Sequence, residues 1–471
     1  MNFLKRFQAP NTYIIISTIL LIVGLLTWIV PGGEFQRQEV TFEDSGMTKE
    51  IVVPESFQKI ENKPQGLLIL TAPFRGFVDA ADIVAFILIV GGAFSIFQRT
   101  KAVDAVIHNI ARAQENNPAL RRLTIPIFMI IFSLGGATFG MSEETIPFVL
   151  IFIPLAYSLG YDGITGVAIP YIGAHVGFAA AFLNPFTLGI AQGIAELPYS
   201  SGLGFRVFCW AVLTGAAIVV VSRHAERVKK DPKLSPTYEL DVERRKTMGL
   251  DLSDDNNKLT GQHKLILTAF GLGMAVMVFG VVKFGWYIAE IAAVFLVTGI
   301  VVGLIARMRG DDIIGAFIDG SKMLIGTAMV IGLSRGIVLV AQDGKILDTI
   351  LFWLASGVQD VHPTISAQVM FYVQSGLNFF VPSGSGQAAL TMPILAPLGD
   401  LIGVSRQTTV LAYQFGDGFS NMIWPTAPVL LGALSLANIP WDRWIRWAWK
   451  AQLVFLILGM LLLIPAVLMD W

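Results

Sequence analysis

Long apolar segments, separated by short polar ones, constrain this chain more than any other feature. The first covers 13–30 and follows two basic residues, Lys5 and Arg6. A helix needs about 20 apolar residues to cross ~30 Å of hydrocarbon. Hydrophobic residues make up 54% of the 471 residues and charged residues only 14%, whereas a soluble chain carries about 25% charged residues. The sequence therefore predicts an all-α polytopic membrane protein whose first apolar run is a retained spanning helix.

Several classes of protein are excluded by composition. The net charge is −1, so the chain offers no basic surface to a nucleic acid. Cys209 is the single cysteine, which excludes an internal disulfide framework and a cysteine-ligated metal cluster. The sequence carries no P-loop motif for ATP. We therefore expect no enzyme, no metal and no cofactor. The expected partners are the lipid bilayer and a small-molecule substrate.

The charged loops orient the apolar segments, because cytoplasmic loops retain Lys and Arg. Residues 33–65 carry seven acids against four bases and are expected outside, whereas 223–264 is rich in Lys and Arg and is expected inside. The N-terminus is then cytoplasmic, in a bacterial inner membrane. All loops agree only if 123–160 and 364–403 enter and leave on the same side, as re-entrant hairpins. Single spans are expected at 83–98, 204–222, 264–282, 286–306, 322–341 and 451–469.

The two halves of the chain resemble each other at an offset of 243 to 245 residues. Matching pairs include Gly92 with Gly336, Asp104 with Asp348, Pro118 with Pro363, Ser142 with Ser385 and Pro154 with Pro397. Segment 101–117 is expected inside and its partner 345–359 outside, and both look like amphipathic arms lying along a membrane face. The repeats are therefore inverted, which is typical of secondary transporters.

This repeat divides the chain into three parts. Residues 1–222 form the first inverted repeat, with the arm 101–117, a cytoplasmic-side hairpin at 123–160 and a broken helix at 163–195. Residues 223–263 form a polar cytoplasmic linker. Residues 264–471 add an extra helix and the second repeat, with the arm 345–359, an external-side hairpin at 364–403 and a broken helix at 406–437.

Polar, glycine-rich sequences interrupt both hairpins where the bilayer is driest. The first tip, 135–145, reads GGATFGMSEET, and its repeat partner, 382–387, reads PSGSGQ. Non-helical backbone at membrane depth persists only where it is buried in protein or lines a watery cavity. The alternative is an ordinary glycine-rich kink. We expect the tips to contact substrate through Ser142, Glu143, Glu144 and Thr145, and through Ser383, Gly384, Ser385 and Gln387.

Polar residues and prolines also interrupt the helix after each hairpin, at 175–187 and 416–428. Proline frees backbone carbonyls, and carbonyl, hydroxyl and amide oxygens suit a hard cation. We expect each pair of tip and break to form a site for a coupling ion, Na⁺ or H⁺, with the substrate between them. The expected cation ligands are Gly140, Asn184, Thr187, Asp417, Ser420 and Thr426. Asn184, Asp417 and Asn421 are also expected to contact substrate.

Ionisable residues inside apolar segments are costly and are functional candidates. Asp417 is expected to bind a cation, a proton or a substrate amine, or else to pair with Arg335. Arg335 is expected to grip a substrate carboxylate at two points, or else to be a fixed counterion for Asp417 or the adjacent glutamates. Glu143 and Glu144 point in different directions, so at most one faces the substrate. His175 is a proton relay or a hydrogen-bonding spacer.

Two acids and a group of tryptophans have simpler interpretations. Asp79 and Asp319 precede apolar runs in similar phrases, which favours helix N-terminal capping for both. Four tryptophans lie between 441 and 449 among basic residues, next to the last apolar run. This pattern is typical of an anchor at the membrane interface.

Four phrases resemble the YfcC family, which belongs with the DcuC-like C4-dicarboxylate carriers of the ion transporter superfamily. They are GATFGMSEETIPF (136–148), GAHVGFAAAFLNPFTLGIAQ (173–192), VPSGSGQAALTMPI (381–394) and YQFGDGFSNMIWPT (413–426). The resemblance covers essentially the whole chain. It implies a secondary carrier that forms a homodimer, with a scaffold and a domain that moves as an elevator. By position, it implies cation and substrate contacts from 142–145, 184–187, 383–387 and 417–426.

These observations favour ion-coupled transport or exchange of a small carboxylate-bearing metabolite. Two acids at the first tip, beside Asp417, disfavour a doubly anionic substrate, so a basic amino acid such as arginine or ornithine leads. An alternative is a Na⁺- or H⁺-coupled C4-dicarboxylate carrier. A passive channel or a membrane sensor is the alternative from another class. A channel needs a continuous pore, and a sensor usually carries a soluble output domain larger than the linker.

Overall fold

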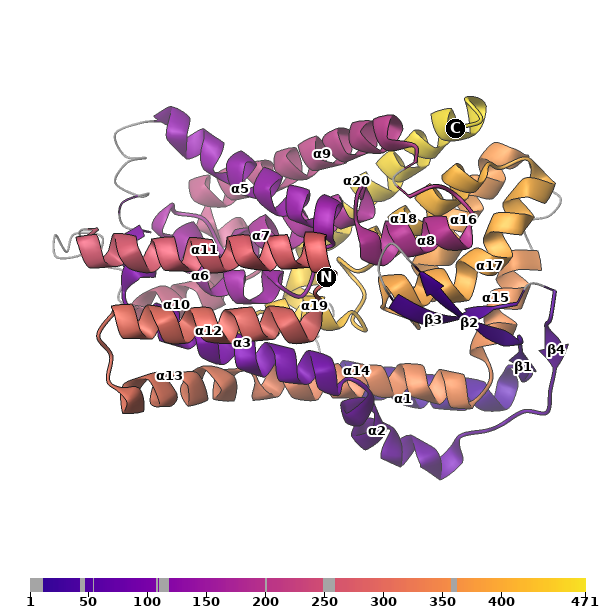
Figure 1. Cartoon of the computed structure of the whole chain (residues 1–471), viewed down its shortest axis with the longest axis horizontal. Helices are drawn as coiled ribbons and strands as arrows, with labels where there is room; N and C mark the ends of the chain where they lie inside the picture. Colours follow the sequence, from indigo (N-terminus) through magenta and orange to yellow (C-terminus); the bar gives the residue numbers. More distant parts are fainter. Residues whose placement is uncertain are drawn as a thin grey trace, which may run out of the picture.

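Helices form most of the structure, a computed structural model that describes residues 12–42, 47–53, 55–106, 109, 118–199, 201–248, 259–356 and 362–471 (Figure 1). In the first half they are α1 (Thr12–Ile29), η1 (Gly66–Thr71), α2 (Ala72–Asp79), α3 (Ala81–Arg99), α5 (Pro118–Phe139), α6 (Thr145–Ser158), α7 (Gly163–Ala179), η2 (Pro185–Gly189), α8 (Ile190–Ile194), α9 (Leu203–Lys230), η3 (Pro232–Leu234) and α10 (Tyr238–Met248). In the second half they are α11 (Gly261–Phe284), α12 (Ile288–Ile305), α13 (Gly310–Met323), α14 (Ile325–Asp343), α15 (Leu347–Ser356), α16 (Pro363–Leu377), α17 (Gly384–Ile402), α18 (Arg406–Ser420), α19 (Pro428–Leu436) and α20 (Trp441–Leu468).

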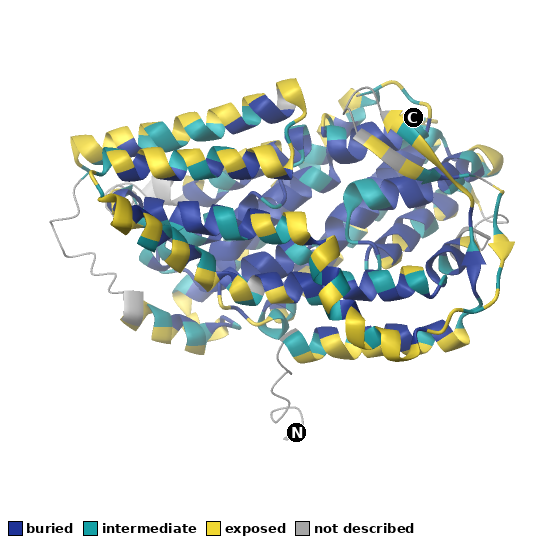
Figure 2. Ribbon diagram, turned by 60° about the horizontal axis from the view of Figure 1, so that its bottom comes forward, coloured by how far each residue is buried: buried dark blue, intermediate teal, exposed yellow. Residues whose placement is uncertain are grey.

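Five helices in the described part of the chain are long and apolar enough to cross a membrane. They are α3, α9, α11, α12 and α20, and a sixth span results if α13 and α14, bent by 43°, are counted together. These helices coincide with the predicted single spans. α1, α5, α6 and α7 are shorter apolar helices. Outer helices expose large apolar side chains, such as Leu272, Leu304 and Leu461, over a buried interior (Figure 2), as lipid contact requires.

The predicted external loop contains small β-sheets that the all-α prediction missed. β1 (Gly33–Glu34) pairs with β4 (Gln58–Lys59), and β2 (Arg37–Phe42) pairs with β3 (Met47–Val52), both antiparallel. This unit is attached to the predicted arm 345–359, because Arg37 donates to the buried Asp348 at 2.8 and 2.9 Å. The arm itself is helical as α15. The other predicted arm, 101–117, lies largely outside the described residues.

The helices pack as two groups. The first, here called the peripheral unit, consists of α1–α3 and α11–α14, in which α14 packs against α1 and α2 while α3 packs against α12 and α13. The second, the hairpin unit, consists of α5–α9 and α16–α20. In it α7 packs against both α5 and α6, and α18 packs against both α16 and α17. α19 contacts α14 and so joins the two units.

Packing in the hairpin unit is reciprocal. α7 and α18 cross each other at the centre. α8, which follows the first break, packs on α17 of the second hairpin, and α19, which follows the second break, packs on α6 of the first. The helix pairs α5–α6 and α16–α17 extend from opposite ends of the molecule toward its middle (Figure 1).

Both helix breaks begin later than predicted. α7 remains helical through His175 to Ala179, and α18 remains helical through Asp417 to Ser420. The glycines in these phrases allow close packing and do not break the helices. A Cβ on Gly177 would lie 1.9 Å from the Ser133 carbonyl oxygen of α5. The breaks themselves lie at 180–184 and 421–427.

The described part of the predicted linker, 223–248 and 259–263, contains helical structure where a polar loop was expected. α9 continues to Lys230, and α10 follows within the same segment. The predicted caps at Asp79 and Asp319 are wrong. Asp79 ends α2 and pairs with Arg335, because α2 packs directly on α14. Asp319 lies inside α13 and pairs with Arg99, 2.7 Å away.

The substitution Gly177→Ala tests the close packing of α5 and α7. The added methyl has no space beside the Ser133 carbonyl. We therefore expect the resulting strain to lower the free energy of unfolding by about 1–3 kcal/mol. The measurement is the thermal unfolding midpoint of the purified protein in detergent. The control is Gly271→Ala in α11, where a Cβ meets nothing within 4 Å. Equal midpoints for the two variants would contradict the packing argument.

Candidate functional site

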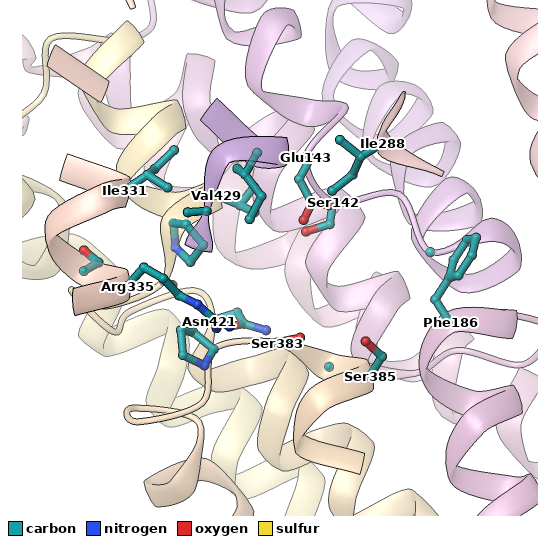
Figure 3. A pocket seen from close by; sticks show the side chains of 18 of the residues that line it. Ser142, Glu143, Phe186, Ile288, Ile331, Arg335, Ser383, Ser385, Asn421 and Val429 are labelled. Atoms are coloured by element: carbon teal, nitrogen blue, oxygen red, sulfur yellow. The ribbon is translucent and has the colours of Figure 1, made fainter. Parts of the chain in front are cut away.

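A cavity of about 280 Å³ lies where the two hairpins, the two breaks and the peripheral unit meet. Hairpin-tip residues Ser142 and Glu143 form one wall, and Ser383 and Ser385 form the facing one (Figure 3). Arg335 extends from α14 toward Asn421 (Figure 3). Further predicted site residues in the lining are Gly140, Thr187, Gly384 and Thr426. The structure thus brings residues from all four polar interruptions to one cavity.

The first tip turns because α5 ends at Phe139 and Gly140 adopts a left-handed conformation, with φ of 76°. Glycine adopts this conformation without steric cost. The two glutamates then diverge. Glu143 lines the cavity, whereas the buried Glu144 folds back and accepts the backbone N–H of Ser142 at 2.9 Å. Thr145 donates its hydroxyl to the Ser142 carbonyl at 2.6 Å. Glu144 and Thr145 therefore support the tip from behind.

The second tip begins α17 and lies against the first break. Ser383 caps this helix by accepting the backbone N–H of Gly386 at 3.3 Å. A Cβ on Gly384 would lie 2.5 Å from Cγ2 of Thr187 and 3.0 Å from Oδ2 of Asp417. No side chain fits there, so the helix start approaches both residues closely. Gln387 does not line the cavity. It donates to the backbone and side-chain oxygens of Gln374 on the other arm of its hairpin.

Three successive carbonyls at the start of the second break accept hydrogen bonds from aromatic side chains. The carbonyl of Asn421 accepts the hydroxyl of Tyr171 at 2.8 Å. The next two carbonyls, of residues 422 and 423, accept the indole N–H groups of Trp444 and Trp441, both at 2.9 Å. An unpaired carbonyl is costly in apolar surroundings, which explains these donors. Trp444 is fully buried, so it is not the interfacial anchor that the sequence predicts.

Hydroxyl oxygens of both breaks lack partners instead. Thr187 Oγ1 and Thr426 Oγ1 are buried and have no hydrogen-bond partner in the described part of the chain. Asn184 accepts the backbone N–H of Phe186 and Thr187, and its Nδ2 is also unpartnered. Buried polar groups of native proteins nearly all have a partner. These two hydroxyls, one at each break, are therefore candidate ligand atoms.

Asp417 lies in the last turn of α18, one residue layer behind Gly384. It is 1% exposed, and its Oδ1 accepts the side-chain amide of Asn421 at 3.1 Å. Neighbouring Ser420 donates its hydroxyl to the Gly416 carbonyl. Asn378, which the sequence interpretation missed, donates to the Asp417 carbonyl, to Ser420 Oγ and to Asn421 Oδ1. Asn378 comes directly after the first arm of the second hairpin, and this position next to the predicted tip could have identified it as a site residue from the sequence.

Arg335 has a different partner from those considered in the sequence. Its Nε donates to Asp79 of α2, and not to Asp417 or to either glutamate. Asp79 and Asp82 both line the cavity from the junction of α2 and α3. Together with Glu143 they give the cavity three acids against one arginine. The sequence interpretation missed Asp82, although both acids stand at the start of an apolar run.

Histidine and aromatic side chains complete the lining. His175 reaches the cavity from α7, and its Nδ1 lies 2.9 Å from the Tyr171 carbonyl. That contact is the one expected of a hydrogen-bonding spacer. Phe178, Phe186 and Tyr287 add apolar surface. The described residues contain no group of three or more His, Cys, Asp or Glu side chains that could hold a metal ion.

Comparisons with known proteins agree with the family resemblance seen in the four phrases. A family model described as a C4-dicarboxylate anaerobic carrier, DcuC, matches residues 9–468. The chain is 37% identical over 503 aligned residues to an Escherichia coli K12 protein with the name "Putative basic amino acid antiporter YfcC", and the match covers 99% of this chain and 98% of that one.

Two solved structures are similar over almost the whole chain. One is the YdaH transporter of Alcanivorax borkumensis, with a TM-score of 0.45 and 16% identity over 98% of this chain and 99% of that one. The other is MtrF of Neisseria gonorrhoeae, from a class of antimetabolite efflux pumps, with a TM-score of 0.46 and 19% identity over 97% and 95% of the two chains. The family match spans nearly the entire sequence and identifies a multi-pass membrane transporter of a small molecule, not an enzyme, channel or sensor. This chain belongs to the DcuC family of C4-dicarboxylate carriers.

Proposed function

We propose that this transporter is a secondary active carrier or exchanger of a small metabolite with a carboxylate and a positively charged end, a basic amino acid. The charge of the cavity carries the proposal. Asp79, Asp82 and Glu143 supply three acids, and Arg335 is the basic residue in the lining. The E. coli relative, which is 37% identical, has a name that describes it as a basic amino acid antiporter. A second candidate substrate is a C4-dicarboxylate, favoured by the description of the family model.

In this proposal the substrate lies between the two hairpin tips. Arg335 meets its carboxylate, because a guanidinium binds a carboxylate at two points, and serine hydroxyls of both tips add hydrogen bonds. Glu143 of the first tip binds the positive end of the substrate. Asp417, which lies behind Gly384, attracts the same end by its charge. Ser142, Ser383, Ser385 and Asn421 line the cavity and are the further proposed substrate contacts. Glu144, Thr145, Asn184 and Gln387, which the sequence also suggested as contacts, are outside the lining, and we propose that they position the tips and the first break.

A coupling cation, Na⁺ or H⁺, is proposed at each break. At the first, Thr187 Oγ1 is available beside Asn184 and Gly140. At the second, Thr426 Oγ1 is available, and Asp417 and Ser420 of the preceding helix α18 are the other proposed ligands. Hydroxyl and carboxylate oxygens suit Na⁺, and a lone buried carboxylate also suits a proton.

The proposed movement is that of an elevator, in which the hairpin unit slides along the peripheral unit. The separate packing of these two groups of helices supports it. The proposal includes inverted repeats, with the α5–α6 hairpin entering from the cytoplasm and α16–α17 from outside, and a homodimer in the inner membrane. It also places the N-terminus and the linker in the cytoplasm, as the charge distribution predicts.

Competition for uptake tests the substrate. Purified protein in sodium-loaded and sodium-free vesicles is given a labelled basic amino acid, and unlabelled arginine, ornithine, succinate and fumarate compete. We expect the two amino acids to inhibit and the dicarboxylates to have no effect, because the cavity has an excess of acids. Inhibition by succinate and not by arginine would reverse the order of the two candidates.

The substitution Asp417→Asn tests the buried carboxylate. The asparagine keeps the shape and can still accept from Asn421, so we expect normal folding. Removing one charge of a buried charged contact costs about 2–5 kcal/mol, so uptake should fall by at least about 30-fold. The control is Asp343→Asn, which removes a carboxylate paired with Arg75 in the peripheral unit, away from the cavity. Unchanged uptake in Asp417→Asn would refute a role for this group.

The substitution Thr187→Val tests the first cation site, because valine has the same shape and lacks the unpartnered hydroxyl. We expect the Na⁺ concentration for half-maximal uptake to rise by about tenfold, equivalent to 1.4 kcal/mol. The control is Thr391→Val, whose hydroxyl is already used by Gln374 and Gln387. Sodium-independent uptake in the unaltered protein would remove Na⁺ from the proposal.

A further inference from the structure

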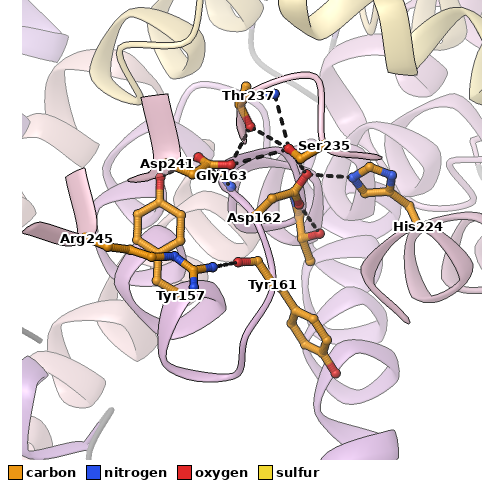
Figure 4. Close-up of polar contacts among 10 residues, drawn as sticks. Tyr157, Tyr161, Asp162, Gly163, His224, Ser235, Thr237, Asp241 and Arg245 are labelled. Carbon is orange, nitrogen blue, oxygen red and sulfur yellow. Dashed lines mark hydrogen bonds and ion pairs between the residues drawn. The ribbon is translucent and has the colours of Figure 1, made fainter. Parts of the chain in front are cut away.

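A buried polar cluster joins the linker to the inner end of the first hairpin (Figure 4). Its centre is Asp162, in the loop between α6 and α7, and Asp241 of α10. These side chains are 1% and 4% exposed, respectively. Neither aspartate belongs to the cavity described above, and the sequence interpretation singled out neither of them. Two buried carboxylates in a membrane protein require many donors, so their partners show which segments they hold together.

Asp162 gathers three elements around one carboxylate. It caps α7 by accepting the backbone N–H and the hydroxyl of Thr165, at 2.9 and 2.6 Å. His224 of α9 lies 2.8 Å from its other oxygen, and Ser235 of the linker donates to that oxygen at 2.7 Å. Burial raises the pKa of this carboxyl, but the hydrogen bonds from His224, Thr165 and Ser235 outweigh burial and leave the pKa below its ordinary value.

Asp241 makes the reciprocal connection from α10 back to the hairpin. It accepts the hydroxyl of Tyr157 of α6 at 2.7 Å and the backbone N–H of Gly163 of α7 at 3.2 Å. Thr237 donates its hydroxyl to the second oxygen at 2.8 Å. A Cβ on Gly163 would lie 2.9 Å from Oδ1 of Asp241, so glycine is what permits this approach.

Basic residues around the cluster add further connections between the same elements. Arg245 of α10 donates to the Tyr161 carbonyl at 2.5 Å, and its guanidinium lies 5.1 Å from the Tyr157 ring centre. Lys229 of α9 donates to the Leu159 carbonyl at 2.8 Å. From α20, Arg443 donates to the Pro236 carbonyl at 3.2 Å and lies 3.6 Å from Glu239. These contacts involve α6, the loop between α6 and α7, α9 and α20, all of which belong to the hairpin unit.

We propose that residues 231–245, here called the linker strut, are a fixed part of the hairpin unit and travel with it during transport. Asp162 and Asp241 are the positioning residues that attach it. The strut is therefore not a passive connection between the two halves of the chain. By holding the inner ends of α6, α7 and α9 together, it sets the rate at which the unit moves and leaves substrate binding unchanged. This inference rests on the elevator movement proposed above.

Cross-linking distinguishes a travelling strut from a stationary one. Cys209 is buried, and Cys209→Ser gives a background for paired cysteines. Glu239→Cys with Arg443→Cys lies within the proposed moving body, whereas Phe148→Cys with Phe270→Cys joins α6 to α11 of the peripheral unit, where the two rings are 6.4 Å apart. A bis-maleimide reagent is added to each pair in vesicles, and uptake is compared before and after.

We expect the first cross-link to leave uptake unchanged and the second to abolish it. Loss of uptake on joining residues 239 and 443 would overturn the strut proposal. Uptake that survives the link between residues 148 and 270 would instead refute the elevator movement, so the two failures are distinguishable. Each pair without reagent must transport normally, which controls for the substitutions themselves.

Two substitutions test the positioning role by kinetics. Asp241→Ala removes the acceptor of the Tyr157 hydroxyl, the Gly163 N–H and the Thr237 hydroxyl. We expect the maximal rate to fall by at least about tenfold, with the KM unchanged, because three buried hydrogen bonds that hold the strut in place are lost. Asp162→Asn keeps the cap of α7 and removes the charge beside His224, so we expect a smaller fall in the maximal rate. Ser405→Ala, which removes the equivalent cap of α18, is the control. A raised KM with an unchanged maximal rate in Asp241→Ala would refute the proposal.

Discussion

The crossing of α7 and α18 is the interaction on which the rest of this structure depends. Gly418 lies against Ala179 there, and a Cβ on that glycine would be only 2.4 Å from the alanine Cβ. Close contact between backbones is how helices associate in a membrane, where no hydrophobic force brings them together. Each crossing helix also packs on both arms of its own hairpin. The crossing therefore holds two hairpin tips and two breaks around one cavity.

The polar groups at the two breaks fall into two sets, one with hydrogen-bond partners and one without. Aromatic donors, Tyr171, Trp441 and Trp444, take three successive carbonyls of the second break. The side-chain hydroxyls of Thr187 and Thr426 have no hydrogen-bond partner among the residues that the structure describes. The unpartnered hydroxyls are therefore the first side-chain atoms to test as cation ligands. The pairing of the carbonyls also explains why part of the tryptophan-rich segment lies inside the protein.

Much of the site was predictable from the residues alone. Glycines, prolines and polar side chains within otherwise apolar segments are costly unless they line a cavity, so the phrases around Ser142, Asn184, Ser383 and Asn421 stood out. The partner of Arg335 was not predictable, because Asp79 lies 256 residues away and meets it only through the packing of α2 on α14. The position of Gln387 was missed for a similar reason: a polar residue near a tip can bond to its own hairpin.

The sequence by itself determined that the chain is a multi-pass membrane transporter, where its spans and polar interruptions lie, and which family it belongs to. Those properties depend on local composition and on motifs, which can be read along the chain. Tertiary structure alone decided which glutamate faces the cavity, where each helix breaks, and that the linker is attached through Asp162 and Asp241. These outcomes depend on which groups approach each other in space. Backbone packing and the pairing of buried polar atoms decide that only when the whole chain is folded.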